Sequence, residues 1–298
     1  MNPAGRLREA RLLGEQATAD SIEWISRNAS ERIRGSMGLD GEPPPACDDA
    51  DEAYMAPGSV ARRLHADLPS MLIGGLSSLL LQSLHPLAMA GVAQHSRYRE
   101  DPLGRLERTA TFVGTTTFRS KDEAAAIIKR VRHIHASVEG TAPDGRRYRA
   151  SDPDLLAWVH VAEVRSFLAA SIAFGPTRWS ADEQDAYVAQ MASVAIDLGA
   201  VDVPRSVAAI DRFLDDVRPE LCLTDEARDV RRFVMLGVRR LPHEMAAYSI
   251  LVAAAQATLP GWARSMLRLP SVPGVDLMAI RPAAKVLSRA IRLVVPTP

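Results

Sequence analysis

The chain is poor in lysine and cysteine, and neither sign of charge is in excess. Lysine occurs only at Lys121, Lys129 and Lys285, so arginine supplies nearly all of the 36 basic side chains, which balance 36 acidic ones. A chain without net charge has no global basic field to attract nucleic acid or anionic lipid. Its two cysteines, Cys47 and Cys222, form no C-x-x-C motif, which argues against a zinc ribbon or a thioredoxin-type site. A disulfide between them is possible, but no pattern supports it.

Several familiar catalytic signatures are also missing. The chain has neither G-x-S-x-G nor a P-loop. No E-x-x-H pair occurs, so the di-iron pattern of carboxylate bundles is absent. The pair His243-Glu244 lacks the second histidine of an H-E-x-x-H zinc site. The first residues are charged and contain no apolar stretch typical of a secretory signal, so we expect a cytoplasmic protein.

What the sequence does contain is a large apolar fraction at helical spacing. Hydrophobic residues make up 47% of 298 positions, enough to bury a sizeable core. The segment Leu68–Ala93 has no Asp, Glu, Lys or Arg and is long enough to cross a membrane. His85-Pro86 interrupts it, and proline breaks a continuing helix. We therefore expect two buried helices here and no transmembrane segment.

Helix starts are well marked along the chain. Ser120 followed by Glu123 and Ser180 followed by Glu183 both match the capping box. Proline after Asp152 stands at a typical first helical position. We predict an all-α fold with roughly ten or more helices in one large domain over residues 56–298, preceded by an N-terminal helical arm and proline-rich loop over residues 1–55. No run of alternating residues favours a sheet, and GTAPDGRRYRASD is expected to be a turn.

Two histidines two positions apart, in VRHIHASVEG, invite a functional interpretation. In a helix beginning at Ser120, the apolar stripe contains Ala124, Ile127, Ile128, Val131, Ile134 and Val138. His135 lies on that stripe and should point inward, whereas His133 lies on the solvated side with Lys129. A buried imidazole tends to be neutral, which is the form that binds a metal or haem iron. The alternative is a core histidine that hydrogen bonds a neighbour.

A third histidine lies in a segment that is apolar almost all round, LLAWVHVA. His160 is followed three residues later by Glu163, and this spacing places both on one side of a helix. A carboxylate there could fix the tautomer of the imidazole, as beside metal sites. A purely structural His–Glu pair is the alternative.

The segment PLGRLERTATFVGTTTF carries arginines among threonines and phenylalanines. Arg105, Arg108 and Thr109 fall on one side of the expected helix with Phe112 and Thr116. Guanidinium groups in such a setting can hold anions or polarise a bound oxygen species. The more ordinary interpretation of arginines at this spacing is a solvated helix face.

Taken together, these segments resemble a known family. The run LLLQSLHPLAMAGVAQHSRYREDPLGRLERTATFVGTTTF, with IHASVEG, GRRYRASDPDLLAWVH and, more weakly, LPHEMAAY, is similar to the DUF2236 family. That family is also described as the catalytic domain of the mycophenolic-acid oxygenase MpaB and of rubber oxygenase, the latex-clearing protein. The resemblance covers roughly residues 56–270. It implies an all-helical fold and oxidative cleavage of isoprenoid double bonds.

The resemblance also implies roles for particular residues. In rubber-cleaving members a b-type haem is bound by a histidine of the IHASVEG-like motif, which corresponds to His135. Those members carry an Arg-x-x-Lys-Thr group on the opposite side of the haem, and here it reads Arg105-Leu106-Glu107-Arg108-Thr109. Arg108 replaces the lysine that caps the iron, and arginine does not readily lose its proton to become a ligand. An open or water-filled distal site is then expected.

These observations lead to one favoured function and two alternatives. The favoured function is a haem b-dependent oxygenase that uses O₂ on an apolar, isoprenoid or lipid substrate. His135 would be the proximal ligand, Arg105, Arg108 and Thr109 would lie near the bound O₂, and His160 with Glu163 would line the cofactor pocket. The alternatives are a non-catalytic helical lipid-binding protein and a non-haem or cofactor-free oxidoreductase with His135 and His160 as metal ligands. The sequence leaves the oligomeric state open.

Overall fold

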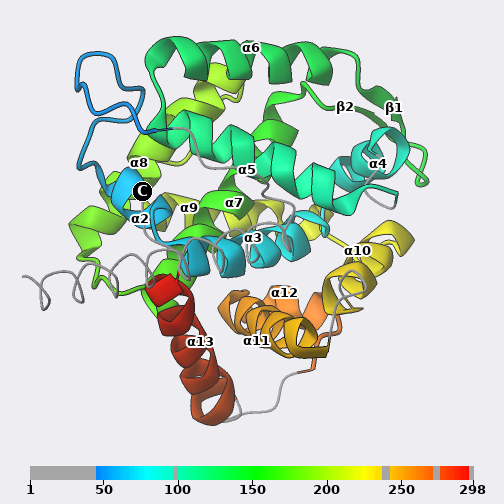
Figure 1. Ribbon diagram of the computed structural model, residues 1–298. Helices are drawn as coiled ribbons and strands as arrows, with labels where there is room; N and C mark the ends of the chain where they lie inside the picture. The colour runs from blue at the N-terminus through cyan, green and yellow to red at the C-terminus, as the bar shows by residue number, and fades with distance from the viewer. Residues whose placement is uncertain (1–44, 97–99, 237–241, 271–275, 295–298) are drawn as a thin grey trace, which may run out of the picture.

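The computed structural model describes residues 45–96, 100–236, 242–270 and 276–294. Over these ranges the chain forms twelve α-helices, one 3₁₀ turn, one π turn and a two-stranded sheet (Figure 1). In chain order the elements are α2 (Val60–His65), α3 (Leu68–Gln82), α4 (Pro86–His95), α5 (Pro102–Phe118), α6 (Lys121–Ala136), β1 (Glu139–Thr141), β2 (Arg147–Arg149), α7 (Pro153–Phe174), α8 (Ala181–Leu198), α9 (Val207–Val217), η1 (Arg218–Glu220), α10 (Asp225–Leu236), α11 (Pro242–Thr258), α12 (Gly261–Met266), η2 (Asp276–Ile280) and α13 (Arg281–Val294). The all-α prediction is confirmed. Residues 1–44, most of the predicted N-terminal arm, lie outside the described residues.

The predicted helix starts are formed by the expected side chains. Both capping boxes are present: Ser120 and Ser180 accept hydrogen bonds from the backbone N–H groups of Glu123 and Glu183, whose carboxylates accept from the capping backbone in return. Asp152 accepts from the N–H of Asp154 at the start of α7. Such caps satisfy N–H groups that have no partner within the helix and contribute about 1 kcal/mol each. Local sequence therefore fixes where these helices begin.

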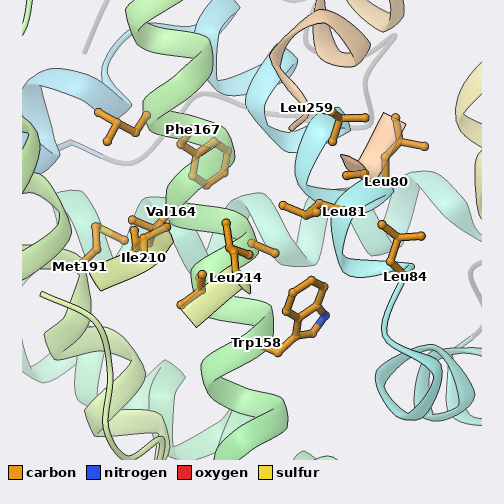
Figure 2. Close-up of a cluster of buried hydrophobic side chains, with 14 of the residues drawn as sticks. Leu80, Leu81, Leu84, Trp158, Val164, Phe167, Met191, Ile210, Leu214 and Leu259 are labelled. Atoms are coloured by element: carbon orange, nitrogen blue, oxygen red, sulfur yellow. The ribbon is translucent and has the colours of Figure 1, made fainter. Parts of the chain in front are cut away.

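Helix α7 is the centre of the fold. Trp158 is fully buried, and Val164 and Phe167 pack into the same cluster as Leu80, Leu81 and Leu84, three residues contributed by or adjacent to α3 (Figure 2). The two helices approach closely because α3 carries a glycine where they meet: a Cβ at Gly74 would lie only 2.6 Å from the ring of Phe167. Each large apolar side chain that is fully buried contributes roughly 2 kcal/mol.

The uncharged segment Leu68–Ala93 forms two helices, as predicted. Helices α3 and α4 are bent by 105° at a break that includes His85, and Pro86 is the first residue of α4. By length and composition alone this pair, or α7, passes the test for a membrane span, but 72% of the apolar window of α7 is buried inside the protein. That degree of burial is also typical of the core helix of a folded domain.

The prediction that no sheet is present, and that GTAPDGRRYRASD is only a turn, was wrong. Strands β1 and β2 form an antiparallel hairpin in which Gly140 pairs with Tyr148. Helix α6 accordingly ends at Ala136, so Val138, which the sequence placed on its apolar stripe, lies beyond the helix. Tyr148 is buried, and its hydroxyl donates to Gln94 Oε1 of α4 at 2.7 Å. The strand pairing depends on this tertiary contact. Strands of three residues are too short to show the alternation of apolar and polar residues by which a strand is predicted from sequence.

Both cysteines are free thiols.

Helices α5 and α6 form an antiparallel hairpin at one edge of the molecule. Only Arg119 and Ser120 connect them, and Figure 1 shows α6 along that edge with α5 beside it. On its other side α6 reaches α8, where Arg132 Nη1 donates to the backbone oxygen of Asp197 at 3.1 Å. Helix α6 therefore lies over both α5 and α8, and its inner face is directed toward the interior.

A buried ion pair joins the C-terminal helix α13 to the core, in addition to the apolar packing of Ala284 and Leu287. The guanidinium of Arg292 donates to both carboxylate oxygens of Asp67, at 2.6 and 2.9 Å, and to the backbone oxygen of Phe174 at 2.8 Å. Asp67 is buried and also accepts from the N–H of Ser70 at the start of α3. One arginine thus connects α13 to the start of α3 and the end of α7.

We expect Arg292→Ala to lower the free energy of unfolding by about 3 kcal/mol, because it leaves the Asp67 carboxylate buried without its cation. The double variant Asp67→Asn with Arg292→Ala should recover part of that loss, since no unpaired charge remains. Urea unfolding followed by circular dichroism measures both. Equal stability of Arg292→Ala and the wild type would show that the ion pair does not hold α13.

Candidate functional site

The inner face of α6 is the one predicted from its apolar stripe, with one exception. Ala124 and Ile128 are buried, His135 is partly buried, and His133 is exposed. The exception is Ile134, which is 49% exposed. It lies at the side of the inward stripe, near the end of the helix, where the described residues leave about half of its surface uncovered.

The imidazole of His135 is in the state that a haem ligand requires. Burial lowers its pKa below the ordinary value of 6.5, so the ring is neutral at physiological pH. Its Nδ1 atom is buried without a hydrogen-bond partner, and the part of the chain that the structure describes offers no partner to the other ring nitrogen. The described residues therefore do not form the alternative arrangement, in which His135 is a core histidine that hydrogen bonds a neighbour. A neutral, unpartnered imidazole fits an axial ligand of haem iron.

The three predicted residues of α5 differ in their surroundings. Arg105 is partly buried and donates from Nη1 to Ser96 Oγ at 3.3 Å. Arg108 is exposed and lies 3.4 Å from Asp101 Oδ2, at the start of its own helix. Thr109 is also exposed, and its hydroxyl donates to the backbone oxygen of Arg105 at 3.0 Å. Of the three, Arg105 is the one that the fold directs toward a neighbouring element.

The fold brings Arg105 and His135 to the same end of the α5–α6 hairpin. Arg105 contacts Ser96 at the end of α4. The last turn of α4 also holds the strand that follows α6, because Gln94 Nε2 donates to the backbone oxygen of Thr141 at 2.9 Å. The start of α5 and the end of α6 therefore meet at α4, although the two residues are thirty positions apart in the sequence.

His160 and Glu163 are both on α7, but they do not form the expected pair. Neither side chain hydrogen bonds the other, and the described residues give neither of them another hydrogen-bond partner. Burial lowers the pKa of His160 to about 4 and raises the pKa of Glu163 to about 7. Side chains three residues apart point in directions that differ by about 60° around the helix axis. Closeness in sequence therefore does not bring these two side chains into contact. The prediction of a tautomer-fixing hydrogen bond was wrong.

A buried polar chain that the sequence did not reveal lies next to Glu163. His65 Nδ1 is 2.7 Å from Thr117 Oγ1, and His65 Nε2 is 3.0 Å from the hydroxyl of Tyr187. These residues come from α2, α5 and α8. Burial lowers the pKa of His65 to about 3, and burial together with the charge of Glu163 raises the pKa of Tyr187. The only sequence signal was a histidine beside the apolar Leu64, because the partners are 52 and 122 positions away.

The described residues do not favour a site of several metal-binding side chains. No three His, Cys, Asp or Glu residues among them cluster in a way that could hold a metal ion. The geometry thus gives no support to the alternative in which His135 and His160 bind non-haem iron with Glu163. A single axial histidine, by contrast, is enough for a porphyrin-bound iron.

The comparison with family models decides what kind of protein this is. The model described as the catalytic domain of the ER-bound oxygenase mpaB/B′ and of rubber oxygenase matches residues 62–293. The chain belongs to this family. No curated protein and no solved structure matches the chain. The matched range contains every element from α3 to α12, so the family assignment covers nearly the whole described fold.

Glu163 should make stability depend on pH. Its pKa rises from 4.5 to about 7 in the folded protein, so the folded state retains a proton that the unfolded chain loses above pH 4.5. The stability that this proton contributes is lost as pH rises through 7. At about 1.4 kcal/mol per pKa unit the effect is at most about 3.5 kcal/mol, and we expect about 2 kcal/mol because the side chain is partly exposed.

The variant Glu163→Gln cannot ionise, so its unfolding free energy relative to the wild type should increase by that amount between pH 5 and pH 8. Urea unfolding at the two pH values gives the difference, with Glu52→Gln on an exposed loop as the control. Parallel pH dependences of the wild type and Glu163→Gln would contradict the assignment.

Proposed function

We propose that the protein is a haem-dependent oxygenase that acts on an apolar, isoprenoid or lipid substrate with O₂. The family assignment supports an oxygenase-type catalytic domain. The observation that carries the haem is the imidazole of His135, which faces inward, is neutral, and has a buried nitrogen without a partner. When bound, the haem would supply the redox chemistry, and the protein would supply orientation and electrostatics.

The α5 residues would act on the side of the haem opposite His135. Arg105, already drawn inward to α4, would donate hydrogen bonds to an oxygen species, because a guanidinium is a fixed set of donors that keeps its charge. Thr109 lies one turn further along the same helix and could add a hydroxyl. Arg108 points toward Asp101 and does not readily lose its proton, so it would leave the distal position open.

An apolar substrate suits the walls that the fold provides. Helices α3, α4 and α7 are apolar, and Val159 of α7 keeps 37% of its surface exposed. The balanced charge of the chain gives no field for nucleic acid, and a cytoplasmic location belongs to the same proposal. Of the original alternatives, a lipid-binding protein without haem would use the same walls.

The visible spectrum of protein purified with haem supplementation tests the cofactor. We expect a Soret band that is retained in His133→Ala and lost, or reduced at least tenfold in haem occupancy, in His135→Ala. His133 is the matched control because it lies on the same helix, two residues away, and is exposed. Circular dichroism shows whether each variant is folded. A Soret band that His135→Ala leaves unchanged, or a bound lipid with no iron, would sink the proposal.

Restoring the lysine of the family motif should change the iron's surroundings. In Arg108→Lys a neutral amine becomes available as a ligand, so we expect a Soret band shifted to that of six-coordinate low-spin haem at high pH. Arg108→Gln, which offers no amine, should keep the wild-type spectrum. Identical spectra for all three proteins at pH 9 would show that this position does not reach the iron.

A further inference from the structure

Glu163 is a charged residue type in the centre of the fold with no evident structural function. It lies in the middle of α7, the helix around which the core is built. The described residues provide no hydrogen bond and no ion pair to its carboxyl group, and burial is the one cause of its raised pKa. A buried carboxyl group without a partner is costly, so its presence calls for an external partner.

The polar groups near Glu163 have other hydrogen-bond partners. The hydroxyl of Tyr187 is paired with His65, whose second nitrogen is paired with Thr117. Arg165, two residues along α7, donates from Nη1 to the backbone oxygen of Thr258 at 2.6 Å. The polar groups around Glu163 are thus arranged to leave its carboxyl free.

The side chain of Glu163 is also not fully enclosed by protein atoms. Glu163 is only partly buried by surface area, yet protein atoms surround it densely enough to raise its pKa to about 7. Both observations hold if the carboxyl borders an accessible space inside the protein. Val159 lies one turn earlier on the same face of α7 and is 37% exposed, so the wall beside the carboxyl is apolar. One turn further, the hydroxyl of Ser166 is buried without a partner.

We propose that Glu163 is the polar anchor of the substrate site, where it binds an uncharged hydroxyl group at one end of an otherwise apolar ligand. This inference rests on the proposed function, from which it takes the class of ligand, an apolar isoprenoid or lipid. It replaces the expected role of Glu163 beside His160 with a direct role in ligand recognition.

The chemistry of the group fits an alcohol better than a hydrocarbon or an acid. A protonated carboxyl can both donate to and accept from a hydroxyl group. A hydrocarbon would displace water and leave the carboxyl unsatisfied, whereas an ionised ligand would bring a second charge into a weakly solvated site. A site built around one buried polar group discriminates against the analogue that lacks its partner by tenfold or more.

Binding of two C20 isoprenoids tests the inference: the alcohol phytol and the hydrocarbon phytane, which share a skeleton. Isothermal titration calorimetry measures the affinity for each probe. We expect the wild type to bind phytol at least tenfold more tightly than phytane. Glu163→Gln, which keeps hydrogen-bonding capacity, should retain that preference within about threefold.

Glu163→Leu should lower the affinity for phytol at least tenfold and leave the affinity for phytane equal or higher. Glu52→Leu, on an exposed loop, is the control and should leave both affinities unchanged. Equal affinity of the wild type for the two probes, an equal loss for both in Glu163→Leu, or no binding of either probe would overturn the inference.

The same preparations separate this inference from the proposed function. A protein that binds haem through His135 but does not prefer phytol contradicts the inference alone. A protein that prefers phytol but shows no Soret band contradicts the haem proposal alone.

Discussion

The packing of α7 against α3 is the constraint on which the rest of the structure depends. Twenty-two residues of α7 run through the centre of the protein, and Gly74 allows α3 to approach it closely. Because this interface excludes water along most of its length, any polar group on α7 or its neighbours must find a partner, remain neutral, or serve a ligand. The polar residues of the interior include examples of each of these three outcomes.

The buried histidines show this most clearly. His65 is satisfied on both sides by Thr117 and Tyr187, so it is a structural element that joins three helices. His135 and His160 are neutral because burial lowers the pKa of each, and neither has a partner among the described residues. The difference separates a histidine that the fold uses from histidines that it leaves available. His135 is the better placed of the two for a cofactor, because it shares its end of the hairpin with Arg105.

Local features of the fold could be predicted from the sequence, and features that depend on distant contacts could not. Helices α5 and α7 begin where the sequence indicates a helix start, because each begins at a proline preceded by a capping aspartate. The hairpin was missed because its strands are short and are held by Tyr148 packing on α4.

The residues of the candidate site show the same difference between features that local sequence predicts and features that depend on distant contacts. The inward direction of His135 followed from helical periodicity, and its neutrality followed from burial. The pairing of His65 with Thr117 and Tyr187, and the contact of Arg105 with Ser96, depend on how different helices meet. Periodicity gives the face on which a side chain lies, but not what stands opposite that face.

The most direct test of the account is a crystal structure of the protein reconstituted with haem. The account predicts a porphyrin at the α4 end of the α5–α6 hairpin, held by a ring nitrogen of His135 bonded to the iron, with Arg105 close enough to donate hydrogen bonds to a bound oxygen species. A haem bound at another place, or an iron whose axial ligand is a different residue, would contradict it.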